Sequence, residues 1–348
     1  QMLDKVIHFS INNKFIIGLF TIALIVVGVY SVSSLPIDAL PDITNNQVQI
    51  VTTSPTLATQ DVEQFITYPV EQAIKPIPKI VELRSVSRFG LSVVTVVFEE
   101  SADLYWARAQ IAERLKEAEN VIPKNLGTPE MAPVSTGLGE IFQYVVFPEK
   151  GFEKKYDATQ LRTIQDWIIK PQLVGTPGVA EVNTLGGLMK QYEIAVNPDR
   201  LRAMDVSITE IFAALEANNE NTGGAYIDKK PYAYFIRSVG MIGTTDDIEK
   251  IVIKNRGGIP VLIRDVARVQ TGSSIRYGAT TKDGHGEEVS GMVMMLKGEN
   301  SGEVTARVKD KIEQIKKSLP EGVAIEPFLD RTKLVGQAIS TVEKNLIE

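Results

Sequence analysis

The sequence predicts an α+β protein with one transmembrane helix near its start and two ferredoxin-like units after it, the second interrupted by an inserted α+β unit. Three observations predict this class. Residues 15–37 are apolar and uncharged, and residues 48–120 follow the order strand, helix, hairpin, helix. The same order begins again near residue 141 and is completed only after residue 278, so residues 189–278 form the insertion.

The apolar segment at residues 15–37 is long enough to cross a bilayer, because about 23 helical residues span about 35 Å. A secretory signal peptide is the alternative interpretation. Its apolar stretch usually has roughly 7 to 15 residues and ends in a small-x-small cleavage site. The segment at residues 31–35, Ser-Val-Ser-Ser-Leu, is a poor cleavage site, which favours a retained span.

Charges beside the span predict its orientation. Lys5 and Lys14 precede it, whereas every charged residue from 38 to 72 is acidic, so we expect a cytoplasmic amino terminus and an exported remainder. Apolar residues recur every fourth position within residues 1–14, which predicts a short interfacial helix. Gln1 precedes the methionine, which we interpret as a cloning remnant.

Periodicity places the elements of the first unit. The apolar pattern changes from a period of two to a period near 3.6 and back, with Phe89-Gly90 as the hairpin turn. The expected elements are a strand at 48–52, a helix at 61–73, strands at 82–88 and 91–98, and a helix at 103–120.

The second unit repeats this order with a long interruption. Residues 177–182 match residues 78–83, each beginning with proline and ending in alternating apolar positions. The expected elements are a strand at 141–147, a helix at 157–173, and, after the insertion, a strand at 289–296 and a helix at 302–319.

The insertion has its own pattern of elements and a distinctive loop. We expect a strand at 191–196, a helix at 198–218, and strands at 234–239, 248–254 and 261–269. The loop at 218–226 is polar and glycine-rich, and either a flexible exposed tip or an arm reaching a neighbouring subunit fits it. The chain closes with an amphipathic helix within residues 329–348 that is too charged to cross a membrane.

Composition excludes several kinds of chemistry. The 348 residues contain no cysteine, carry a formal net charge of −6 and include two histidines. A disulfide framework, a thiolate site and a histidine-based catalytic triad are therefore disfavoured, and the acidic balance disfavours nucleic-acid binding. His8 and His285 are interpreted as solvated polar residues. A phosphate-binding loop is missing, so we expect no nucleotide-driven motor within this chain. We also expect no cofactor and no enzymatic activity.

Two kinds of side chain are candidates for metal binding. Met292 and Met294 lie two apart on an expected strand and share a face, and thioethers select monovalent copper or silver. Core packing is the commoner use of such methionines. Glu140 lies where a glycine-rich connector enters a strand, and its carboxylate would suit a divalent ion. A solvated residue at the start of the strand is the alternative interpretation for Glu140.

Several ordered motifs together resemble one family, the heavy-metal efflux branch of the resistance-nodulation-division permeases, which export copper and silver or cobalt, zinc and cadmium. These motifs lie at residues 36–43, 87–92, 103–108, 137–144, 177–182 and 218–224. The resemblance extends over the whole chain, but it corresponds only to the leading portion of such a permease.

The resemblance implies a proton-driven homotrimeric pump of the bacterial inner membrane that works with a periplasmic adaptor and an outer-membrane channel. It also implies that Glu140 lines the metal path in a zinc-, cobalt- or cadmium-type pump, and that the loop contacts the adjacent protomer. The loop residues concerned are Asn219, Asn221, Gly223, Gly224 and Tyr226.

The resemblance divides the chain as follows: a cytoplasmic interfacial helix at 1–14, a transmembrane helix at 15–37, a first porter subdomain at 38–135, a second porter subdomain at 136–188 and 279–328, an inserted docking subdomain at 189–278, and an amphipathic helix at 329–348 that leads to a further span.

Residues 15–37 contain no ionisable side chain for proton coupling, and one helix cannot provide alternating access. We therefore expect that this portion alone does not transport. A membrane-anchored periplasmic scaffold that binds a partner is the alternative function. A metal-dependent hydrolase is disfavoured because no general base or nucleophile is recognisable.

Overall fold

The computed structural model describes residues 11–33, 44–221, 223–229, 232–237, 240–276 and 278–347. Within them the predicted mixture of helices and sheets is confirmed. Most of the expected interfacial helix, and the segment that joins the expected span to the first unit, lie outside the described residues.

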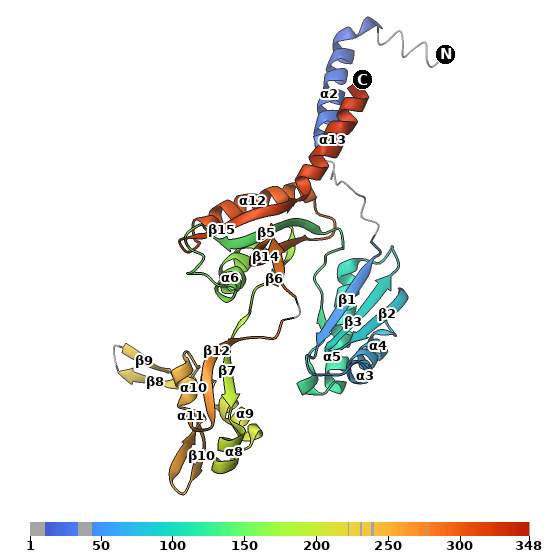
Figure 1. Ribbon diagram of the computed structural model, residues 1–348. Helices are drawn as coiled ribbons and strands as arrows, with labels where there is room; N and C mark the ends of the chain where they lie inside the picture. The colour runs from blue at the N-terminus through green and yellow to red at the C-terminus, as the bar shows by residue number, and fades with distance from the viewer. Residues whose placement is uncertain are drawn as a thin grey trace.

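The first unit is an antiparallel sheet with helices on one face (Figure 1). Its strands, in spatial order, are β2 (Ile80–Arg88), β3 (Leu91–Phe98), β1 (Gln47–Thr53) and β4 (Glu130–Met131). The helices are α3 (Thr59–Val62), η1 (Glu63–Thr67), α4 (Tyr68–Ile74) and α5 (Leu104–Val121), with the short η2 (Lys124–Leu126) after them. Alternate residues of β1, Val48 and Ile50, pack against Ile66 and Ile111 in the core.

The second unit has the same layers. Strand β14 (His285–Met295) lies between β5 (Glu140–Pro148) and β6 (Val179–Gly186), while β15 (Val323–Asp330) pairs with β5 and β13 (Thr280–Lys282) pairs with β14. The covering helices are α6 (Ala158–Ile164), η3 (Gln165–Ile169), α7 (Lys170–Val174) and α12 (Ser301–Lys316). Tyr144 is fully buried in this core and donates its hydroxyl hydrogen to Oε1 of Gln165 at 3.0 Å.

Each unit contains a π-helical segment where the sequence predicts one regular helix. Segment η1 ends two residues before Pro69, and η3 ends two residues before Pro171. Proline lacks the N–H of a regular turn and its ring displaces the carbonyl four residues earlier, so the preceding turn widens.

The inserted segment has a third core, separate from the other two. Strands β7 (Lys190–Val196) and β12 (Ala267–Ser273) pair and connect it to the second unit. Its other elements are α8 (Pro198–Met204), α9 (Ile208–Ala217), the hairpin β8 (Gly223–Lys229) and β9 (Tyr232–Arg237), α10 (Thr245–Glu249), the hairpin β10 (Val252–Arg256) and β11 (Ile259–Leu262), and α11 (Ile263–Val266).

Three expected elements of the insertion are wrong. The single helix at 198–218 is broken at Asp205, which has a left-handed backbone with φ of 52°, and Ser207 starts α9 through a capping box with Glu210. The expected strand at 261–269 is interrupted by α11, and the expected strand at 248–254 begins within α10. Thr244 caps the start of α10, and Asp265 Oδ2 accepts a hydrogen bond from Leu262 N at the start of α11.

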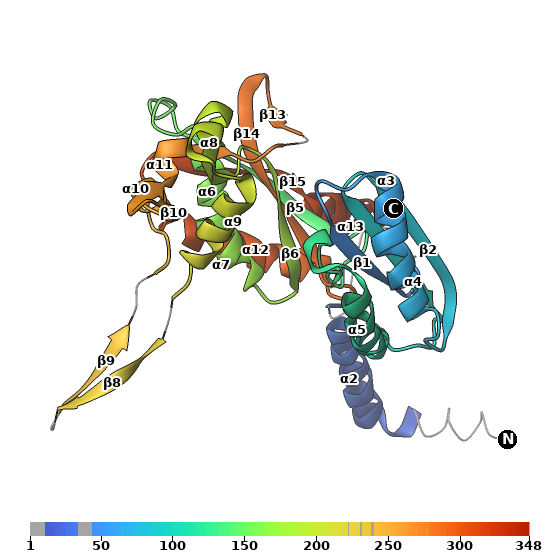
Figure 2. The same ribbon diagram turned by 90° about the horizontal axis from the view of Figure 1, so that it is seen from below.

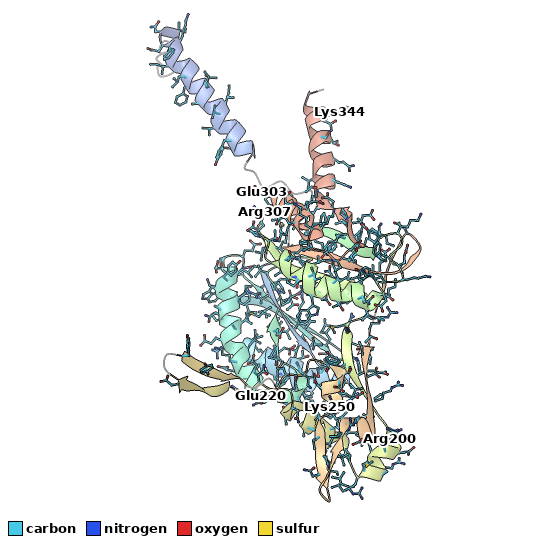
Figure 3. The ribbon with its side chains drawn as sticks, turned by 90° about the vertical axis from the view of Figure 1, so that its left-hand side faces the viewer. Arg200, Glu220, Lys250, Glu303, Arg307 and Lys344 are labelled. Carbon is cyan, nitrogen blue, oxygen red and sulfur yellow. The ribbon has the colours of Figure 1, made fainter. Side chains whose placement is uncertain are left out.

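Helices α2 (Lys14–Ser33) and α13 (Arg331–Ile347) lie at one end of the molecule, and the inserted segment lies at the other (Figure 1). Figure 3 shows the same long axis, with Lys344 of α13 far from Arg200 of α8. Among the residues that the structure describes, no helix has the length and apolar character needed to span a bilayer.

Gly291 provides a test of packing in the second unit. It pairs with Tyr144 across the sheet, and a β-carbon at this position would overlap the tyrosine ring. Because that ring is fixed by burial and by Gln165, we expect Gly291→Ala to destabilise the fold by about 1–3 kcal/mol in urea unfolding. Gly278→Ala is the control, since nothing lies within 4 Å of its added carbon. Equal stability of the two variants would contradict this packing.

Asp330 provides a test of pH dependence. Its carboxylate accepts a hydrogen bond from Thr332 N at 3.0 Å and forms an ion pair with Lys309 Nζ at 2.5 Å. Burial opposes ionisation of Asp330, but the bonds and charge of Lys309 and Thr332 outweigh burial and lower its pKa. A lowered carboxyl pKa stabilises the fold above about pH 3.9, and that stability is lost as the pH falls through the folded-state pKa.

We therefore expect Asp330→Asn to lower the free energy of unfolding by about 1–2 kcal/mol at pH 7, and the difference from the unmodified chain to shrink toward about pH 3. Urea unfolding at both pH values measures it. Asp310→Asn, an exposed carboxylate on α12, is the control. A difference that stays constant with pH would contradict the role of the charge.

Candidate metal-binding site

A β-bulge in β5 changes which side chains share a face of the second sheet. Val293 pairs with Phe142 and Met294 pairs with Glu140, so Ile141 is an extra residue in the ladder. Residues three apart on a regular strand point to opposite faces. Because of the bulge, Gln143 and Glu140 lie on the same face, and Gln143 Nε2 donates to Glu140 Oε2 at 3.2 Å.

A second bulge lies on the other side of β14. Met294 pairs with Glu181 and Met295 pairs with Val179, so Ala180 is the extra residue in β6. Glu181 lies next to this bulge in regular register, and Asn183 Nδ2, two residues along the strand, donates to Glu181 Oε1 at 3.0 Å. Each carboxylate is thus oriented by an amide on its own strand.

The bulge in β5 and the regular register of β6 align a row of three side chains across the sheet: Glu140, Met294 and Glu181. Neighbouring strands lie about 4.8 Å apart, so the backbones that carry the two carboxylates lie about 10 Å apart with the thioether between them. The next row is Gln143, Met292 and Asn183. Side chains about 4 to 5 Å long can therefore bring both carboxylates toward one ion above Met294.

The row lies on the face opposite the helices. Val293 and Met295 point into the helix-covered core, while Met292 and Met294 share the other face, as the sequence predicts. Met294 and Glu181 line a cavity of about 310 Å³ whose other walls come from the first unit and from the connector at 132–137. Met294 is only 8% exposed, because this cavity encloses it.

Two cationic side chains line the same cavity. Arg108 of α5 donates from Nη1 to the carbonyl of Ala132 at 2.7 Å. Lys297, just after β14, donates from Nζ to the carbonyls of Thr44 at 3.1 Å and Asn45 at 3.3 Å. Burial lowers the pKa of Arg108, but a guanidinium stays charged at neutral pH.

The row alone supplies an incomplete ligand set. Within the described ranges, no group of three or more histidine, cysteine or acidic residues is placed to hold a metal ion. Two carboxylates and one thioether are fewer than the four ligands that zinc takes. A bound ion would complete its coordination with water or with residues beyond this chain.

Sequence reasoning identified part of this site. Glu140, Met292 and Met294 were candidates, whereas Glu181 was not, because nothing in the sequence marks Ile141 as the bulge that brings Glu140 into one row with Glu181. A regular ladder would turn Glu140 away from Gln143. His8 lies outside the described residues, and His285 begins β14.

The residues expected to contact a neighbouring protomer lie at the start of the β8–β9 hairpin, which projects away from the rest of the insertion (Figure 2). Asn219 Oδ1 accepts a hydrogen bond from Ile242 N at 3.1 Å, and Asn221 Oδ1 accepts one from Gly240 N at 3.0 Å. These amides close the base of the hairpin. Gly223, Gly224 and Tyr226 lie in β8 itself.

Comparisons with known proteins agree over the whole chain. Residues 6–348 match the family described as AcrB/AcrD/AcrF. The cation efflux system protein CzcA of Alcaligenes sp. is 42% identical to the chain. The alignment covers all of this chain and 33% of that protein. The chain is 40% identical to the nickel and cobalt resistance protein CnrA of Cupriavidus metallidurans, covering 35% of it.

A further relative and a crystal structure also match the chain. The chain is 38% identical to the cation efflux system protein CusA of Escherichia coli and covers 33% of it. A crystal structure of a heavy metal efflux pump matches with a TM-score of 0.88 and 31% identity, over 98% of this chain and 34% of that one. The chain thus spans about a third of the length of these relatives.

Proposed function

The chain belongs to the AcrB/AcrD/AcrF family, and we propose that it is the leading third of a heavy-metal cation efflux pump. The observation that carries this proposal is the row of Glu140, Met294 and Glu181 on one face of the second sheet. Whole-chain similarity to efflux proteins favours the pump over a periplasmic scaffold.

The ligand chemistry of the row suits a divalent ion of borderline softness. Carboxylate oxygens accept zinc, cobalt and cadmium, and a thioether adds preference for the softer members of that group. The amides of Gln143 and Asn183 hold the carboxylates in place without a competing positive charge. We therefore propose that Glu140 and Glu181 bind the transported ion as substrate.

The proposed pump is a proton-driven homotrimer of the bacterial inner membrane, with a periplasmic adaptor and an outer-membrane channel as partners. We propose that this part of the chain carries a membrane anchor within residues 15–37, where helix α2 has no charged residue after Lys14 and its apolar side chains are exposed, Phe15 by 83%. Its amino terminus would be cytoplasmic and the sheets periplasmic. This part alone would not transport, because α2 holds no proton-carrying group.

The three cores support the proposed division into subdomains. The core around β1 and α5 belongs to the proposed first porter subdomain at 38–135. The core around β5 and α12 unites residues 136–188 with 279–328 as the second, and the third core belongs to the docking subdomain at 189–278. We propose that the β8–β9 hairpin of this subdomain contacts the adjacent protomer.

Zinc titration of the purified chain tests the role of the carboxylates. We expect Glu140→Gln and Glu181→Gln each to weaken zinc binding at least tenfold in calorimetry, which is about 1.4 kcal/mol, because a neutral amide is a poor metal ligand. Glu313→Gln on the outer side of α12, where the carboxylate pairs with Lys316, is the matched control.

The same change in the full-length protein extends the test to function. Glu140→Gln should lower cellular resistance to zinc, cobalt and cadmium, as measured by growth in graded metal concentrations. Zinc affinity and resistance that both remain at the control level would contradict the proposed site.

Replacement of the thioether tests its share in selectivity. Met294→Leu conserves volume, so the fold should remain, but it removes the sulfur between the carboxylates. We expect cadmium affinity to fall more than cobalt affinity in paired titrations. Met295→Leu, in the core of the same strand, is the control, and an unchanged affinity ratio in Met294→Leu would exclude the sulfur as a ligand.

A further inference from the structure

We propose that the cavity between the first and second units takes the metal ion as a complex with a small organic polycarboxylate, the metal facing Glu181 and Met294 and the free carboxylates facing Arg108 and Lys297. This inference rests on the proposed function, since it names the form in which the transported ion enters the site.

The size of the cavity is the first observation. At about 310 Å³ it lies at the lower end of the roughly 300–1,000 Å³ typical of small-molecule sites. It is far larger than a single ion requires. Its walls come from β1 and α5 on one side and from β6 and β14 on the other, so both units would contact one ligand.

The charges of the walls are the second observation. Within the described chain, Arg108 and Lys297 bond only to main-chain carbonyls and neither forms an ion pair with a carboxylate. A carbonyl oxygen accepts the hydrogen bond of each cationic group but does not neutralise its positive charge. A half-buried cation is stabilised most by an anion, so the cavity favours an anionic ligand.

The opposite charges that line the cavity explain why the ligand should be a complex. Arg108 and Lys297 weaken the binding of a bare divalent cation, and Glu181 weakens the binding of a bare anion. A chelate carries both charges. Its metal could take Glu181 and Met294 as additional ligands while an uncoordinated carboxylate pairs with the positive charge of Arg108.

Calorimetric titration of the purified chain with zinc alone, citrate alone and zinc citrate tests this proposal. We expect zinc citrate to bind at least tenfold more tightly than citrate. Arg108→Gln and Lys297→Gln should each weaken zinc citrate at least tenfold, whereas zinc alone should bind as tightly as before or more tightly, because a repelling charge is removed. This opposite sign separates a ligand-binding role from general damage to the cavity.

Arg256→Gln is the matched control, because the guanidinium of Arg256 likewise donates to a carbonyl, that of Ala203 at 3.1 Å, but lies outside the cavity. Arg108→Lys and Lys297→Arg keep the charge if the glutamine variants fail to fold, and both should retain zinc citrate binding. Zinc citrate affinity that is unchanged in folded glutamine variants, or lost in folded charge-conserving variants, overturns the proposal. If the unmodified chain does not bind zinc, that result would instead overturn the proposed function.

Discussion

The extra residue in β5 is the constraint on which the candidate site depends. Ile141 shifts the ladder of β5 by one position, so that Glu140 lies opposite Met294, where the regular register of β6 also places Glu181. Without this bulge the alternation of β5 would place a core side chain where the Glu140 carboxylate now lies. The bulge is stable because Ile141 is fully buried beneath the helices, so the shift adds apolar contact to the core.

The site also depends on the two units facing each other. The row lies on the sheet face that the helices leave uncovered, and the first unit covers part of that face through the connector at 132–137. Lys297 fixes this arrangement by binding two carbonyls just before β1. The enclosed space therefore combines acidic and basic walls, and any relative movement of the units would change the separation between them.

The sequence predicts the regular elements well and the irregular ones poorly. Strand β3 has the predicted bounds because its continuous apolar residues and the turn at Gly90 leave little choice. The break at Asp205 was missed although Ser207 and Glu210 form a capping box that marks the start of α9. The bulge at Ile141 that brings Glu140 into one row with Glu181 has no comparable local mark, because it arises from packing against the helices. The metal row therefore could not be predicted in full.

Anomalous diffraction at the zinc absorption edge, from crystals of the zinc-loaded chain, tests the central claim most directly. The account predicts an ordered zinc ion bound by the carboxylates of Glu140 and Glu181 on the Met294 side of the second sheet. Ordered zinc at other carboxylates, with this row empty at the same concentration, would contradict it.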